Sequence, residues 1–214
     1  MKITCTVHGP RALPRSAPFS NQLVLTTHVK YAPFATRHRR GYLRDPSERD
    51  LGVQLESALR GVIIADRWPK SGVDVIVTII EGDQARDELL PGSGDWDMMT
   101  VLSGCITVAS AALVDAGIDC VDIVSGGVAA AAAHHEVDDG ISFLADPVAM
   151  EHDKLLAVCC VAYLPTRDEI TNLWIKSQLT VPDPVLYSKL IGRAVQAARG
   201  SNKALVEGLT GSLP

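Results

Sequence analysis

Five arginines lie close together in the first quarter of the chain and are its clearest candidates for chemistry. They are Arg37, Arg39, Arg40, Arg44 and Arg49. Between Lys30 and Arg49, six basic residues stand against two acidic ones, a local charge of +4, and the total of -5 therefore leaves -9 for the remainder. Guanidinium groups bind phosphate oxygens through paired hydrogen bonds. The stretch therefore predicts a local, sequence-independent phosphate-binding patch on an otherwise acidic protein.

A second interpretation of these arginines stays open. Acidic side chains follow them at Asp45, Glu48 and Asp50. The arginines could pair with these carboxylates in a solvated loop and helix start, and such surface pairs carry little binding information.

Other polar clusters are weaker candidates. One cluster has metal-ligating side chains at His134, His135, Glu136, Asp138 and Asp139. Its sequence is more typical of a polar hairpin turn. The run 92–94 is a Gly-Ser-Gly sequence without the lysine of a nucleotide-binding loop, and it indicates a flexible connection. The five cysteines have no zinc-like spacing, so we interpret them as buried, reduced thiols. We expect no metal and no cofactor.

The elements that must position these residues follow from apolar periodicity and from turn residues. We expect helices from about 46 to 63, 98 to 116 and 180 to 209. We expect strands over about 2–7, 22–31, 73–80, 120–133, 141–145, 155–163 and 169–176. The unbroken β-branched run 73–80 is typical of a strand buried on both faces. From the sequence we expect no signal peptide and no apolar run long enough to cross a bilayer. The order ββ-α-β-α-ββββ-α predicts an α+β fold.

Five ordered segments resemble the RNase PH superfamily. They are TVHGPR (6–11), RDPSERDLGVQLESALRGVI (44–63), WPKSGVDVIVTIIEGD (68–83), ASAALVDAGI (109–118) and LPTRDEIT (164–171). The resemblance implies an RNase PH-like fold, similar to the second domain of ribosomal protein S5, with mixed sheets, two central helices and a C-terminal helix. It implies one domain over residues 1–214 and leaves open whether an N-terminal strand or tail of the family is missing. The stretch 32–51 is most similar to the eukaryotic exosome ring subunit named for an mRNA-transport defect.

Active members of this family use inorganic phosphate to remove nucleotides from the 3′ end of RNA. The resemblance places their phosphate-binding Gly-Thr-Arg run at residues 100–102, where Val101 and Leu102 replace the hydroxyl and the guanidinium. It places their catalytic aspartate at Val158. Asp153 is the nearest acid upstream, and Asp146 lies at the end of the preceding expected strand. Neither a valine nor a leucine side chain can bind phosphate or transfer a proton. The resemblance therefore implies a non-catalytic chain, with an active phosphorolytic exoribonuclease as the alternative.

The family also implies a setting. Arginines before and within the first helix face single-stranded RNA, so the patch from Arg37 to Arg49 is expected to contact it. The expected partners are other RNase PH-like ring subunits, cap subunits with S1 and KH domains, and a hydrolytic nuclease, with no membrane partner. RNA processing and degradation, rRNA included, would take place in the nucleus, the nucleolus and the cytoplasm.

Overall fold

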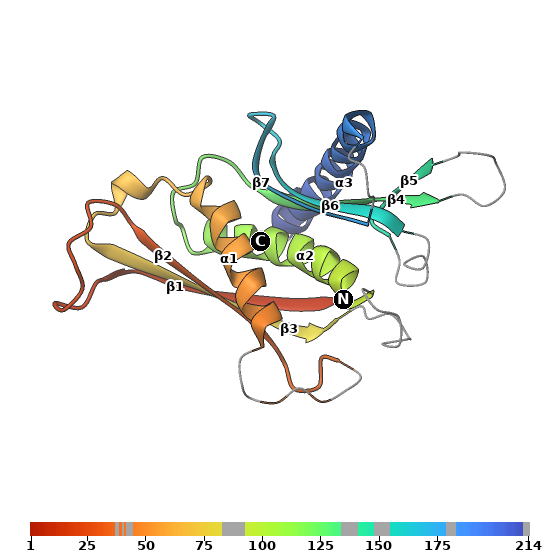
Figure 1. Ribbon diagram of the computed structural model, residues 1–214. Helices are drawn as coiled ribbons and strands as arrows, with labels where there is room; N and C mark the ends of the chain where they lie inside the picture. Colours follow the sequence, from red (N-terminus) through yellow and green to blue (C-terminus); the bar gives the residue numbers. More distant parts are fainter. Residues whose placement is uncertain are drawn as a thin grey trace.

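Where the structure describes the chain, it forms two β-sheets and three α-helices in the predicted order (Figure 1). The computed structural model describes residues 1–36, 39, 41, 45–82, 93–133, 141–147, 155–178 and 183–211. The strands are β1 (Lys2–Ala12), β2 (Val24–Tyr31), β3 (Ser71–Glu81), β4 (Ser125–Ala133), β5 (Ile141–Ala145), β6 (Leu155–Leu164) and β7 (Glu169–Ser177). The helices are α1 (Pro46–Arg60), the short 3-10 turn η1 (Ala65–Arg67), α2 (Ser93–Asp115) and α3 (Pro184–Gly211). The predicted α+β class and element order are confirmed.

The first sheet has the strand order β1-β3-β2. β1 pairs antiparallel with β3, whereas β2 pairs parallel with β3 because α1 crosses over between them. Two expectations fail here. β1 continues beyond His8 to Ala12, with a register irregularity between His8 and Arg11. β3 buries only one face completely, since Ile76 and Thr78 on the other face are half-buried.

The second sheet is fully antiparallel, in the order β5-β4-β6-β7. Its strand β4 consists almost entirely of small residues, and helices press on both of its faces. A Cβ added to Gly126 would overlap the Ser103 backbone of α2, and one added to Gly127 would overlap the Ala194 and Ala198 backbone of α3. Only glycine permits such close approach of a strand to two helices.

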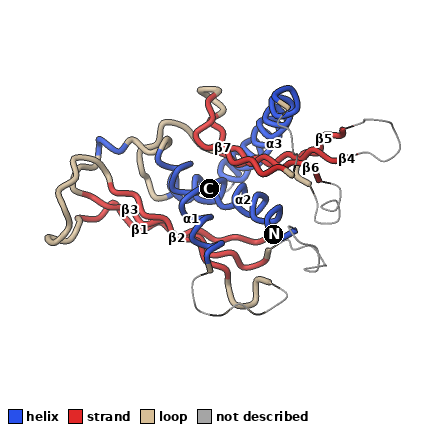
Figure 2. Tube along the Cα trace, in the orientation of Figure 1, coloured by secondary structure: helices blue, strands red, loops and turns tan. Residues whose placement is uncertain are grey.

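The layers stack in the order sheet, helices, sheet, helix (Figures 1 and 2). α1 and α2 lie between the two sheets, and α3 covers the outer face of the second. Two apolar clusters result. Cys160 belongs to the large one around α2 and Cys159 to the smaller one under α3, as alternation along a strand requires.

Helix α2 corrects one sequence expectation. Its segment Trp96–Asp115 is long and apolar enough to cross a membrane, judged by length and composition alone. Here the helix packs against β1, β4, β6 and α1, so a position between two sheets accounts for its apolar character. Trp96, near the start of this helix, is buried in the large apolar cluster.

Candidate functional site

The candidate RNA-contact site begins where β2 meets α1. The Glu48 carboxylate is buried and accepts a hydrogen bond from the Tyr31 N–H at 3.0 Å. The Thr27 hydroxyl donates to the Gly52 carbonyl oxygen at 2.8 Å. These two bonds hold α1 against β2 on either side of the arginine-rich stretch. Glu48 therefore does not close a capping box with Asp45, the role that its spacing suggests; the Asp45 carbonyl oxygen instead accepts the Glu48 and Arg49 N–H groups.

The turn that follows β2 is fixed by three main-chain hydrogen bonds. The Ala32 N–H donates to the Ile79 oxygen at 2.8 Å, and the Ala35 N–H donates to the Ala32 oxygen at 2.9 Å. The Gly82 N–H donates to the Ala35 oxygen at 3.2 Å. Ala32 and Ala35 are buried, so the turn is anchored to the end of β3 at both of its ends.

Two of the five predicted arginines lie in the part of the chain that the structure describes. Arg39 is exposed and lines an open cleft of about 450 Å³ together with Pro33, Phe34 and Thr36. Arg49 is exposed on the first turn of α1. Within the described ranges, neither guanidinium belongs to an ion pair. The remaining members, Arg37, Arg40 and Arg44, lie outside the described residues.

Phe34 is the residue of this region that the sequence reasoning missed. Its side chain is 74% exposed, although its neighbours Ala32 and Ala35 are buried. The sequence did contain a signal for it, because Phe34 lies between the end of a predicted strand and a run of arginines.

The three residues that the resemblance places at the family's catalytic positions are buried. Val101 and Leu102 on α2 are 2% and 1% exposed, and Val158 on β6 is 0% exposed. All three belong to the large apolar cluster. None of these side chains can reach a substrate, whatever its chemistry.

A cleft of about 560 Å³ lies beside α2, at Thr100, Ser103 and Thr107. Its other walls come from β4, from the end of β5 and from α3. Asp146 is the one charged side chain among the described lining, which contains no lysine, arginine or histidine side chain for an anionic phosphate. Asp153, the other acid considered for catalysis, lies outside the described residues.

Two hydroxyls near this cleft have structural partners. Thr107 Oγ1 donates to the Ser103 oxygen at 3.0 Å and accepts the Gly126 N–H at 3.0 Å. Ser125 is completely buried and donates to the Ala198 oxygen at 2.9 Å, so it is no nucleophile. The segment from His134 to Asp139, which the sequence predicts to be a polar turn, lies outside the described residues.

The cysteines are free. Cys105, Cys159 and Cys160 are buried, as the sequence predicts, whereas Cys5 and Cys120 are only half-buried. Burial raises the pKa of Cys5 and Cys120 to about 11, and that of Cys105 and Cys159 to about 12. Burial also raises the pKa of Cys160. Because the thiolate is the reactive form, these side chains are poor nucleophiles at neutral pH.

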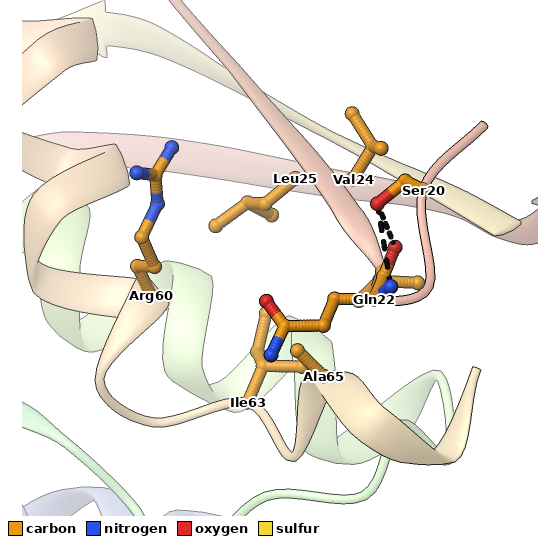
Figure 3. Close-up of a pocket in the computed structure, with 8 residues that line it drawn as sticks. Ser20, Gln22, Val24, Leu25, Arg60, Ile63 and Ala65 are labelled. Atoms are coloured by element: carbon orange, nitrogen blue, oxygen red, sulfur yellow. Dashed lines mark hydrogen bonds between the residues drawn. The ribbon is translucent and has the colours of Figure 1, made fainter. Parts of the chain in front are cut away.

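A further pocket, of about 250 Å³, lies between the start of β2 and the end of α1 (Figure 3). Its polar groups pair with protein partners. Arg60 forms an ion pair with Glu56, and Gln22 Nε2 donates to Asp66 at 3.0 Å. The Ser20 hydroxyl donates to the Gln22 carbonyl oxygen at 2.7 Å. The pocket offers a ligand few uncommitted polar groups.

Comparison with known proteins identifies the family. The family described as "3′ exoribonuclease family, domain 1" (RNase PH) matches residues 1–119. The chain is 62% identical over 211 residues to "Exosome complex component MTR3" of Chaetomium thermophilum, covering 98% of this chain and 74% of that protein. This identity confirms the resemblance to the ring subunit named for an mRNA-transport defect.

More distant relatives have the same kind of name. The chain is 32% identical over 126 residues to "Exosome complex component mtr3" of Schizosaccharomyces pombe, which covers 59% of this chain and 44% of that protein. It is 26% identical over 185 residues to the human MTR3 protein, which covers 80% of this chain and 61% of that protein. The chain thus spans less than two thirds of these two relatives.

The fold is shared with a solved structure. The crystal structure of rice (Oryza sativa) Rrp46 superposes with a TM-score of 0.72 at 16% identity, over 97% of this chain and 83% of that one. This likeness confirms the expected RNase PH-like fold. The match over residues 1–119 and the identity over almost the whole chain lead to one conclusion: the chain belongs to the RNase PH family of 3′ exoribonuclease domains.

Proposed function

We propose that this chain is a non-catalytic subunit of an exosome core ring, which helps to build the ring and guides single-stranded RNA to 3′-to-5′ processing or degradation. One observation supports the proposal: Val101, Leu102 and Val158, which the resemblance places at the family's phosphate-binding and catalytic positions, are apolar and buried. The chain keeps the fold of a phosphorolytic enzyme and lacks groups that could bind phosphate at those positions. The names of its relatives support the exosome setting.

The partners in this proposal are other RNase PH-like ring subunits, cap subunits with S1 and KH domains, and a separate hydrolytic nuclease. The proposed locations are the nucleus, the nucleolus and the cytoplasm. Positive charge gathered between Lys30 and Arg49, on a chain of net charge -5, would attract RNA locally without coating the protein with it.

A phosphate-dependent assay tests the absence of catalysis. The purified chain is incubated with single-stranded RNA, with and without inorganic phosphate, and nucleoside diphosphates are measured. We expect no release above the no-protein control. Phosphate-dependent release would favour the alternative of an active exoribonuclease.

Ring formation is tested by native mass spectrometry with RNase PH-like partner subunits. A defined hetero-oligomer is expected. A chain that stays alone with every such partner would contradict the structural role.

RNA contact by the arginine patch is tested with a double variant, Arg39→Ala with Arg49→Ala. The control removes two exposed arginines elsewhere, Arg15→Ala with Arg193→Ala. Each lost phosphate contact lowers the slope of log affinity against log salt by about 0.7 for single strands. We expect the slope to fall in the first variant alone. Equal slopes in both variants would return the patch to the solvated-loop interpretation.

A further inference from the structure

Phe34 combines three properties that together indicate a ligand. A single exposed apolar side chain is common on protein surfaces and carries no argument. Phe34, however, lies on an anchored turn, it lines a cleft, and it shares that cleft with a cationic side chain.

The anchoring matters because it removes much of the cost of ordering. The bonds from Ala32 to Ile79 and from Gly82 to Ala35 hold the turn to the end of β3. The ring of Phe34 is therefore presented to solvent on a preorganised backbone, and a ligand that contacts it has little backbone to immobilise.

The charge around the ring favours an anion. Arg39 lines the same cleft as Phe34, and the described lining, completed by Pro33 and Thr36, contains no acidic side chain. Glu81, which precedes the anchoring Gly82, forms an ion pair with Lys2 at 2.9 Å. An aromatic face next to a guanidinium is the combination with which proteins hold single-stranded nucleic acid, through base stacking and phosphate contact.

We infer that Phe34 is a stacking platform for one base of single-stranded RNA and that Arg39 contacts a neighbouring phosphate. The inference rests on the proposed RNA contact of the arginine patch and adds a base-stacking contact to it. Stacking is tolerant of sequence, because every base presents a π face. The site therefore retains RNA without selecting it. An apolar side chain of a protein partner is the competing occupant.

The experiment separates bases from phosphates. The full chain is titrated with a fluorescent uridine oligonucleotide and with an abasic oligonucleotide of the same length, which keeps the phosphates. The variants are Phe34→Ala, Phe34→Leu, Phe34→Trp and Arg39→Ala. Phe19→Ala is the matched control, because Phe19 is also 74% exposed and lies within 5.5 Å of a cation, Lys70.

We expect Phe34→Ala and Phe34→Leu to weaken binding of the uridine oligonucleotide by about tenfold, and Phe34→Trp to restore it. Binding of the abasic oligonucleotide should be the same for these variants and for the unmodified chain. Arg39→Ala should weaken binding of both oligonucleotides, and Phe19→Ala of neither.

The outcomes separate the two proposals. If the unmodified chain binds neither oligonucleotide, the proposed RNA contact fails, and the stacking platform fails with it. If it binds the uridine oligonucleotide and Phe34→Ala binds equally well, the platform alone is overturned. Unchanged RNA binding with weaker assembly onto an RNase PH-like partner would assign Phe34 to a protein interface.

Discussion

The buried carboxylate of Glu48 holds the main-chain N–H of Tyr31 at 3.0 Å, and this single hydrogen bond joins the start of α1 to the end of β2. The bond spans the stretch that contains Arg37, Arg39, Arg40 and Arg44. Its two ends therefore determine where that stretch leaves one element and enters the next.

The first prediction concerns this bond. Glu48→Ala leaves the Tyr31 N–H without its acceptor, so we expect the free energy of unfolding to fall by about 1–3 kcal/mol. Glu48→Gln keeps an acceptor oxygen and should cost less. Urea unfolding measures both, and Asp50→Ala, an exposed neighbour on the same turn, is the control. A similar loss in Asp50→Ala would mean that helix-start charge, and not the bond, is responsible.

The second prediction concerns the glycine pair of β4. An alanine at Gly126 or Gly127 drives a Cβ into the backbone of α2 or α3, and overpacking of this kind costs about 1–3 kcal/mol or more. Gly192 on α3 has open space around it, so Gly192→Ala should stabilise by about 0.5–1 kcal/mol. Thermal unfolding gives the melting temperature of each variant. A shift of all three melting temperatures in the same direction would contradict this account.

The third prediction tests whether the family's catalytic residues can be restored. Leu102→Arg places a charge in the apolar cluster, and we expect a loss of about 3 kcal/mol or more, without any gain of phosphorolysis. Leu102→Met keeps the volume and should cost less than about 1.5 kcal/mol. A stable Leu102→Arg variant that releases nucleoside diphosphates would show that position 102 can face a substrate.

The fourth prediction uses the thiols. Because burial raises the pKa of Cys5 and Cys120 to about 11 and of Cys105 to about 12, the native chain should react slowly with a thiol reagent at pH 7.5. The partly exposed Cys5 and Cys120 should react before the buried cysteines, and denaturant should expose all five. Rapid modification of Cys105 in the native state would contradict the packing of α2.

The fifth prediction concerns pH. The Tyr163 hydroxyl donates to Asp168, and with Arg199 it holds the pKa of that carboxyl below its ordinary value. A lowered pKa contributes stability above the unfolded value, near 4, that is lost as pH falls through the folded value. In Tyr163→Phe the Asp168 pKa should rise, as followed by NMR titration, and the acid unfolding midpoint should move to higher pH. An unchanged titration would assign the lowered pKa to Arg199 alone.

The sequence predicted the elements better than their environments. The apolar run of β3 suggested burial on both faces, but residues of one strand cannot reveal that helices cover only one side of its sheet. The spacing of Asp45 and Glu48 fits a capping box, and the tertiary bond to Tyr31 takes the carboxylate instead. Val101, Leu102 and Val158 were placed at catalytic positions by resemblance. Their burial, which depends on the packing of distant segments, could be seen only in the structure.

The glycines of β4 make two helices from different layers rest on opposite faces of one strand, at adjacent residues. No side chain stands between these backbones, so there is nothing at the junction to rotate or compress. A displacement of α3 would reach α2 through main chain alone, and the two layers should move as one body. In an assembly, a force on α3 would therefore displace α2 as well.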